Sequence, residues 1–264
     1  MMKSRPKMQT GSIFDIHVHL LGDAGLDGEF MEFARRWKMP FAVSCLGPEV
    51  AMLAEPTVDE IRKCNDMVLD LVDRNPGFAY GFCYVNPAHG NQAVEEIRRC
   101  VRDGGMVGIK LWVAVKCSDE RAFPIAEEAI GLDVPILQHS YLRLVEVLPG
   151  ESKPADIVAL ASRYPGMRMI MAHMAFRWRE GVDTVRDYPN LLVDTCGFDP
   201  ELGSIEYAVE KLGVDRVLFG SDAPGRDILA QLGKVMAAGI PEPDREKILR
   251  GNAERLLGLN GGAR

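Results

Sequence analysis

The chain has 264 residues, 47% of them hydrophobic and 26% charged, and a formal net charge of −7. This composition is typical of a globular protein, and the length suits one barrel-sized domain or two smaller domains. The acidic balance, with a pI near 5.4, argues against a nucleic-acid-binding surface. No apolar run reaches the roughly 18 residues of a membrane span, so we expect neither a membrane nor a nucleic-acid partner.

The N-terminal segment and the cysteines indicate the compartment. The start of the chain is basic, but no apolar stretch follows it, so we expect residues 1–11 to be a flexible segment and not a signal peptide. The six cysteines contain no Cys-x-x-Cys pair, and their spacing resembles neither a zinc ribbon nor a disulfide framework. We therefore expect reduced thiols in a cytoplasmic protein.

Short apolar segments alternate with amphipathic segments along the whole chain. The apolar segments predict strands at 13–20, 41–45, 78–85, 106–112, 134–139, 168–173, 191–194 and 216–219. The amphipathic segments predict helices at 29–38, 57–74, 91–101, 120–130, around 157–163, 179–187, 205–212, 227–237 and 245–257, and Thr57 with Glu60 forms a capping box for the second of these.

Eight such repeats predict an α/β fold, a (β/α)8 TIM barrel that forms a single domain over residues 1–264. A doubly wound open sheet is the alternative. It is disfavoured because no glycine-rich phosphate-binding fingerprint follows the first strand.

Polar residues occur where the predicted strands end, which is where barrels of this kind carry function. On the first strand, His17 and His19 are two residues apart and would point to the same face, so they could form half of a metal site. The polar residues at the strand ends are His17, His19, Lys110, His139, His173, Asp194 and Asp222. Four of the five histidines in the chain are among them, which favours a metal centre over unrelated polar residues.

Six short motifs surround these residues. They are Phe14-Asp-Ile-His-Val-His19, Gly108-Ile-Lys-Leu111, Leu137-Gln-His139, Met171-Ala-His173, Val193-Asp-Thr195 and Phe219-Gly-Ser-Asp-Ala-Pro224. They resemble the amidohydrolase superfamily, and more narrowly its amidohydrolase-related branch, which includes nonoxidative decarboxylases of the aminocarboxymuconate semialdehyde type. The resemblance extends from Ile13 to Leu259, and it also implies the barrel fold.

The resemblance implies a mononuclear metal centre in an enzyme. His17, His19, His139 and Asp222 would ligate one divalent ion, for which zinc is the first choice and manganese or iron are alternatives. His173 would lie beside the ion and polarise a substrate carbonyl or move a proton.

Three further polar residues would support this centre. Lys110 is expected to be a plain ammonium group, although strand-four lysines of binuclear relatives are carboxylated. Asp15 would brace the first strand through hydrogen bonds, and Asp194 would be structural.

The predicted reaction is hydrolysis of a C–O or C–N bond in an ester, lactone or amide by metal-activated water. Asp222 would accept and return the proton, and His173 would help to stabilise the oxyanion, so both are candidate catalytic residues. A nonoxidative decarboxylase using the same site is the alternative. The chain is short compared with such decarboxylases, which favours hydrolysis. A barrel that binds a ligand without catalysis is a third hypothesis, and the intact ligand set argues against it.

Cationic side chains on the segments after the strands indicate the substrate. We expect a small anionic molecule, carboxylated because arginine binds carboxylates through two parallel hydrogen bonds. The residues expected to bind it are Lys110, Trp112, Arg143, Arg177 and Arg179. The oligomeric state stays open at this point; a homodimer is one option, because exposed helices of such barrels often pair.

Overall fold

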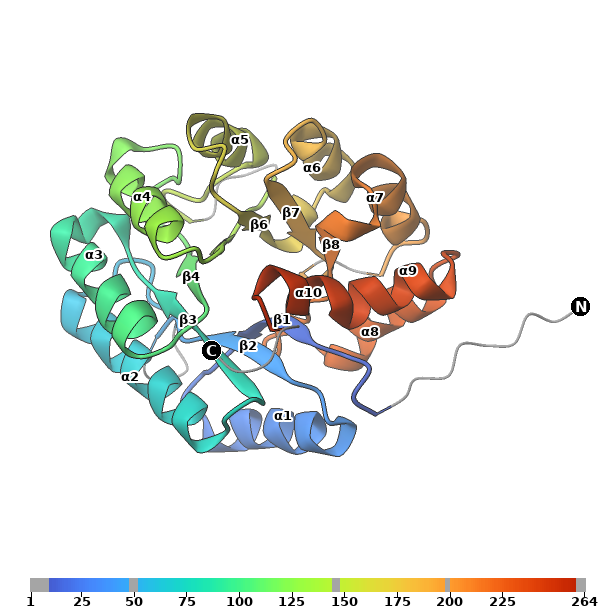
Figure 1. Ribbon diagram of the computed structural model, residues 1–264, viewed down its shortest axis with the longest axis horizontal. Helices are drawn as coiled ribbons and strands as arrows, with labels where there is room; N and C mark the ends of the chain where they lie inside the picture. The colour runs from blue at the N-terminus through green and yellow to red at the C-terminus, as the bar shows by residue number, and fades with distance from the viewer. Residues whose placement is uncertain (1–9, 48–51, 144–147, 198–199, 260–264) are drawn as a thin grey trace, which may run out of the picture.

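A computed structural model describes residues 10–47, 52–143, 148–197 and 200–259 (Figure 1). The segment 1–11, predicted to be flexible, lies outside this range except for its last two residues. Of these, Gly11 donates its N–H to the carbonyl oxygen of Trp37 at 2.8 Å.

Eight parallel strands form one sheet in which the spatial order is the chain order. They are β1 Asp15–His19, β2 Phe41–Ser44, β3 Ala79–Tyr84, β4 Gly108–Leu111, β5 Ile136–Gln138, β6 Met169–Met171, β7 Leu191–Asp194 and β8 Val217–Leu218. The segment after β8 lies beside β1, since the Ile16 N–H donates to the Phe219 carbonyl at 3.0 Å and Val18 bridges Ala223. The sheet closes on itself, so the predicted (β/α)8 barrel is confirmed.

Helices surround the strands on the outside of the barrel (Figure 1). They are α1 Ala24–Trp37, α2 Val58–Arg74, α3 Asn91–Ile97, α4 Phe123–Gly131, α5 Pro154–Arg163, α6 Trp178–Val185, α7 Ser204–Leu212, α8 Ile228–Ala237, α9 Glu242–Glu246 and α10 Asn252–Leu256. Short 3-10 helices cover Pro87–His89, Glu120–Ala122, Ala172–Ala175 and Val214–Arg216, and π-helical turns cover Arg98–Asp103 and Lys247–Gly251.

Several helices differ from the prediction, among them the first and the last. Helix α1 begins five residues before the predicted Glu29, because the Asp23 carboxylate caps it by accepting from the N–H groups of Gly25 and Leu26 at 2.9 Å. The predicted helix at 245–257 is interrupted by the π-helical turn between α9 and α10.

The core has two layers that fix where a site can form. One buried cluster fills the space between strands and helices, with residues such as Val43, Ile109 and Val193. A second cluster joins apolar residues of several strands, among them Ile16 and Leu137, to residues of the last turn of the chain, including Leu256. Figure 1 shows α10 lying across the centre of the barrel at this end. The open end is therefore the opposite one, where the strands end.

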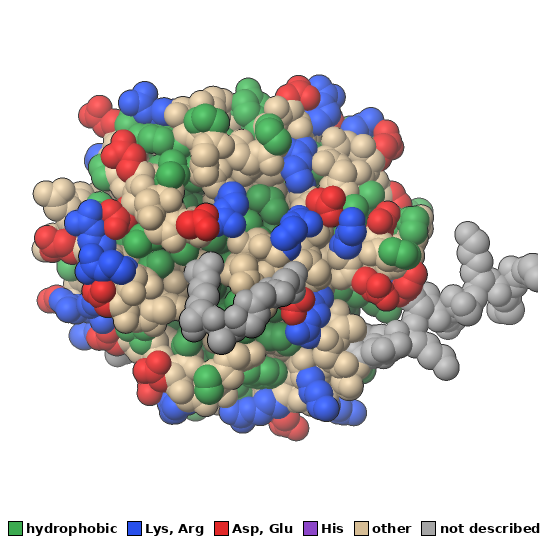
Figure 2. All heavy atoms as spheres, in the orientation of Figure 1, with side chains coloured by type: hydrophobic (Ala, Val, Ile, Leu, Met, Phe, Trp, Pro, Cys, Tyr) green, Lys and Arg blue, Asp and Glu red, His purple; other side chains and the backbone are tan. Residues whose placement is uncertain are grey.

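The described part of the surface carries charged side chains of both signs. On the face shown in Figure 2, acidic and basic side chains are interspersed over the helices. Among the described residues, no helix combines the length and the apolar character needed to cross a bilayer.

Candidate active site

Three predicted ligand side chains converge at the open end of the barrel. The Nε2 atoms of His17 and His19 lie 3.1 Å apart. The Asp222 Oδ1 atom, just past β8, lies 3.3 Å from the His19 Nε2 and 3.8 Å from the His17 Nε2. These three ligand atoms all lie within 4.8 Å of one another. Both imidazoles are buried, and the Asp222 side chain is 18% exposed toward the cavity.

This donor set fits a divalent metal ion. Metal–ligand bonds of about 2.0–2.2 Å place neighbouring ligand atoms roughly 3 Å apart or slightly more, as here. Ligating histidines must be neutral, and burial lowers the pKa of His19 to about 4, although its hydrogen bond to Asp222 acts in the opposite direction. Burial alone would raise the pKa of Asp222, but the hydrogen bond from His19 and the neighbouring imidazoles outweigh it and hold that pKa well below its usual value.

Each of the two β1 histidines is oriented by a partner on its far side. The His17 Nδ1–H donates to Asp194 Oδ2 at 2.8 Å. The His19 Nδ1 lies 3.1 Å from the Ser44 Oγ and 3.4 Å from the Ser44 carbonyl oxygen. Because one nitrogen of each ring is used in this way, the other presents its lone pair to the centre.

Asp15 and Lys110 support the same strand. Asp15 Oδ1 accepts from the N–H groups of His17 and Ser221 at 3.1 and 3.0 Å, which ties β1 to the segment after β8 as predicted. Burial raises the pKa of Asp15 to about 7. The Lys110 Nζ lies 2.8 Å from the His17 Nε2, and burial lowers the pKa of the Lys110 ammonium to about 8.

His139 lies beside this group and not within it. Its Nε2–H donates to Glu151 Oε1 at 2.8 Å, and its Nδ1 lies 3.2 Å from the His173 Nε2. Burial lowers the pKa of both His139 and His173. Ligation by His139 therefore stays a prediction, which would use its Nδ1 in this orientation.

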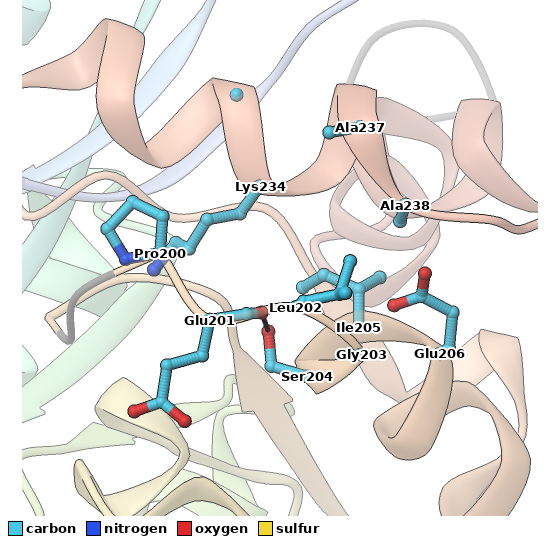
Figure 3. Close-up of a pocket in the computed structure, with 11 residues that line it drawn as sticks. Pro200, Glu201, Leu202, Gly203, Ser204, Ile205, Glu206, Lys234, Ala237 and Ala238 are labelled. Carbon is cyan, nitrogen blue, oxygen red and sulfur yellow. Dashed lines mark hydrogen bonds between the residues drawn. The ribbon is translucent and has the colours of Figure 1, made fainter.

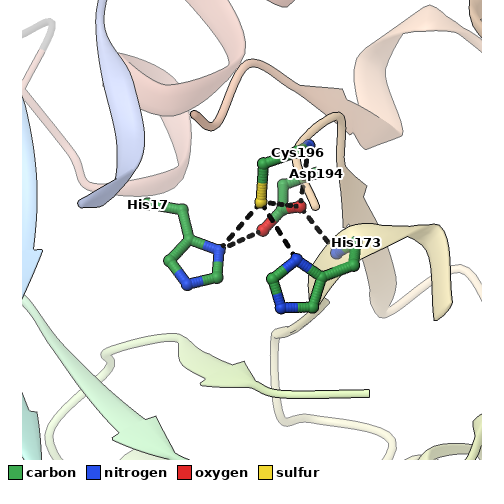
Figure 4. Close-up of side chains that lie close together, drawn as sticks. All are labelled: His17, His173, Asp194 and Cys196. Atoms are coloured by element: carbon green, nitrogen blue, oxygen red, sulfur yellow. Dashed lines mark hydrogen bonds and ion pairs between the residues drawn. The ribbon is translucent and has the colours of Figure 1, made fainter. Parts of the chain in front are cut away.

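A buried thiol lies behind the histidines, as Figure 4 shows. Cys196 Sγ lies 3.0 Å from Asp194 Oδ1 and 3.2 Å from His173 Nδ1. Burial raises the pKa of this thiol well above its usual value, so it stays protonated and can donate to Asp194. The backbone N–H of His173 also donates to Asp194 Oδ1, at 2.8 Å. Asp194 thus holds both His17 and His173, which is the structural role expected of it.

Five of the side chains described above, those of His19, Lys110, His139, His173 and Asp222, border a cavity of about 250 Å³. It is lined by His19, Leu46, Met52, Lys110, Trp112, His139, Tyr141, Arg143, Leu148, His173, Asp222, Gly225 and Arg226. Three of the residues predicted to bind substrate, Lys110, Trp112 and Arg143, are in this lining.

Arg177 and Arg179, also predicted to bind substrate, do not line the cavity. Arg177 forms an ion pair with Glu180 at 2.5 Å, and the Arg179 guanidinium lies 4.4 Å from the centroid of the Trp178 ring. The turn Ala172–Ala175 lies between the end of β6 and these two residues. Although Arg177 and Arg179 follow β6 in the sequence, they therefore do not lie at the end of that strand. Their role in substrate binding therefore stays a prediction.

Sequence reasoning missed several residues of the site. Ser44 is the last residue of β2 and lies one residue before the end of the predicted strand 41–45, so a search for polar residues at strand ends could have found it. Glu151, Tyr141 and Arg226 lie in loops, where no periodic pattern indicates which way a side chain points.

A second hollow, of about 180 Å³, lies between α7 and α8 and away from the strand ends (Figure 3). Its lining includes Leu202, Ile205 and Ala237, and the Ser204 hydroxyl donates to the Glu201 carbonyl at 3.0 Å. It contains no histidine or cysteine, so it offers none of the chemistry found at the strand ends.

Comparison with known proteins finds similarity to enzymes. Residues 14–259 match the model of a family described as amidohydrolase. The chain is 25% identical over 274 residues to a gamma-resorcylate decarboxylase of Polaromonas sp. strain JS666, with 83% of this chain and 82% of the relative covered. The crystal structure of 2,6-dihydroxybenzoate decarboxylase from Rhizobium has a TM-score of 0.77 at 21% identity and covers 96% of this chain and 100% of its own.

A further similar structure contains a bound metal ion. It is a dihydroxybenzoic acid decarboxylase from Polaromonas with bound manganese and the inhibitor 2-nitroresorcinol. Its TM-score is 0.69 at 21% identity, and 95% of this chain and 98% of that chain are covered. The manganese is a property of that protein, and zinc is not confirmed for this chain.

The prediction of hydrolysis is wrong. The curated relative and the two similar structures named above are decarboxylases. The argument from chain length fails as well, because this chain aligns with the whole of a solved decarboxylase chain.

Proposed function

Because the chain belongs to the amidohydrolase family, we propose that it is a metal-dependent nonoxidative decarboxylase that releases carbon dioxide from a small aromatic carboxylate. The similarity to a decarboxylase over 83% of the chain carries this proposal. The site agrees with it, since a divalent-metal donor set and cationic side chains border one cavity.

The metal ligands we propose are His17, His19, His139 and Asp222. Manganese is the ion we propose first, since a similar decarboxylase holds it, and zinc is the alternative. When bound, such an ion would hold and polarise the oxygen atoms of the substrate.

The protein's own side chains would bind the substrate around this centre. The Lys110 ammonium and the Arg143 guanidinium attract its negative charge. The indole of Trp112, which is largely buried in the cavity wall, offers a flat apolar surface to an aromatic ring.

The reaction breaks the bond between the ring carbon and the carboxylate carbon, and the ring carbon gains one proton from solvent. We assign delivery of this proton to Asp222, whose carboxylate faces the cavity. Because its pKa is held low, Asp222 must take up this proton before it can pass it to the ring carbon. His173, also in the lining, is placed to bind a substrate oxygen, with its backbone held by Asp194.

Product analysis tests the proposal. Protein reconstituted with Mn²⁺ is incubated with 2,6-dihydroxybenzoate and related hydroxybenzoates, and carbon dioxide and the decarboxylated phenol are measured. We expect both products in equal amounts and their loss on chelation. Asp222→Asn should lower kcat by roughly 10² to 10⁴-fold, while the exposed control Asp187→Asn should not change it. Hydrolysis of an ester or lactone panel without carbon dioxide from any carboxylate would refute the proposal.

A further inference from the structure

Three side chains that are not predicted metal ligands, Tyr141, Arg143 and Arg226, line the same cavity. Tyr141 and Arg143 follow β5, and Arg226 lies between β8 and α8. The Arg143 Cζ lies 4.3 Å from the centroid of the Tyr141 ring, and the Arg226 Nη2 lies 3.5 Å from the Tyr141 Oη. Two guanidinium groups from different loops therefore meet at one tyrosine.

Tyr141 is fixed in place by its other contacts. Its hydroxyl donates to the Gly197 carbonyl at 2.7 Å, and its ring stacks on His139 with centroids 5.3 Å apart and planes 25° apart. Because its single O–H is used, Tyr141 is not free to donate to a ligand. Its contribution is to position the two guanidinium groups.

Both guanidinium groups retain donors for a ligand. Arg143 Nε lies 3.3 Å from Glu151 Oε2, and Arg226 Nε lies 4.0 Å from Asp222 Oδ2. The two arginine side chains are 34% and 47% exposed. Since a guanidinium has five N–H donors, these contacts with the described residues leave most of them available.

The charges around the cavity exceed what one carboxylate would balance. The lining contains three cationic side chains, Lys110, Arg143 and Arg226, and one carboxylate, Asp222. A divalent ion would add two positive charges. Even when the buried carboxylates of Glu151 and Asp194 are counted, a monoanionic substrate leaves a positive excess, which a second negative charge on the substrate would offset.

We propose that Tyr141, Arg143 and Arg226 form a subsite for a second carboxylate of the substrate, so that the natural substrate is an aromatic dicarboxylate. The inference rests on the proposed function, in which the first carboxylate leaves as carbon dioxide. The second stays on the product and is bound by the arginine side chains, whose planar donors match a carboxylate.

Binding of unreactive acids tests the subsite without catalysis. Benzoate is compared with isophthalate and terephthalate, which add a second carboxylate at two different positions, by calorimetry on the Mn²⁺-loaded protein. We expect at least one dianion to bind about tenfold or more tightly than benzoate. In Arg226→Gln this preference should fall about tenfold while benzoate binding stays within about twofold. The preference of Arg226→Lys for a dianion should lie between those of the parent and Arg226→Gln. Arg177→Gln, which changes a residue outside the cavity, should show the same preference as the parent.

Each result decides the question. Equal binding of benzoate and both dianions, or an equal loss of all three in Arg226→Gln with unchanged Tm and manganese content, overturns the subsite. If dianions are preferred but no aromatic carboxylate yields carbon dioxide, the subsite stands and the proposed reaction is wrong.

Discussion

Glu151 is the residue on which the least certain ligand, His139, depends for its orientation. By accepting from the Nε2–H at 2.8 Å it leaves the Nδ1 lone pair turned to the cavity side. If His139 ligates the metal, removing this acceptor must weaken metal binding.

We expect Glu151→Ala to raise the dissociation constant for Mn²⁺ about 10- to 100-fold, measured by competition with a chelator. The matched control is Glu180→Ala, which removes an exposed carboxylate paired with Arg177 and should leave the constant unchanged. Unaltered affinity in Glu151→Ala would mean that His139 is not a ligand.

Gly197 holds His173 in place by lacking a side chain. Its φ is +80°, and a Cβ there would lie 2.0 Å from the His173 Nδ1. Gly203 has a similar φ of +86° but nothing within 4 Å of a Cβ, so it provides a control with the same backbone strain.

We expect Gly197→Ala to lower kcat by about 100-fold or more, because His173 must move by around 1 Å or more. Gly203→Ala should lose a comparable amount of stability, about 1–2 kcal/mol, with kcat within about twofold of the parent. Steady-state kinetics with thermal unfolding of both variants separates the two effects. Equal losses of kcat would indicate strain and not displacement of His173.

Among the secondary-structure elements, local sequence patterns were most informative where hydrogen bonds are local. The capping box of α2 was predicted from Thr57 and Glu60, and both of its hydrogen bonds are present. The π-helical turn before α10 was not predicted, since a one-residue change in hydrogen-bond spacing hardly alters the apolar pattern. Gly25 and Gly28 hid the start of α1, because they read as breakers while the Asp23 cap stabilises the helix.

We expect Thr57→Ala to lower the free energy of unfolding by about 1 kcal/mol, because the N–H of Glu60 loses its acceptor. Thr184→Ala removes a hydroxyl that donates within α6 to the Glu180 carbonyl, where no cap is lost, and should cost less. Urea denaturation measures both. A Thr57→Ala variant as stable as the parent would show that α2 is held by packing alone.

For the whole barrel, the strand-end rule brought His17, His19 and Asp222 together from opposite ends of the chain, because parallel strands in a closed sheet all end on one side. The same rule failed for Arg177 and Arg179, which follow a strand in sequence but belong to the next helix. Closure fixes where strands end. It does not fix the path of a loop.

Burial of the histidines makes the stability of the metal-free protein depend on pH. Burial lowers the pKa of His19, His139 and His173. Below about pH 6.5 the imidazoles of the unfolded chain therefore bind protons that the folded protein does not bind. Asp15 acts in the opposite direction, since burial raises its pKa from an ordinary 3.8 to about 7 in the folded protein. Three groups therefore lose stability as the pH falls, and one gains it.

We expect the Tm of the metal-free protein to fall by at least about 5 °C between pH 7 and pH 5, measured by differential scanning calorimetry. Asp15→Asn removes the opposing proton uptake, so its Tm should fall more steeply over the same range. A parental Tm that rises toward pH 5 would mean that the buried imidazoles are not held neutral. Because metal ligation requires neutral imidazoles, that result would also remove the basis for the donor set at the strand ends.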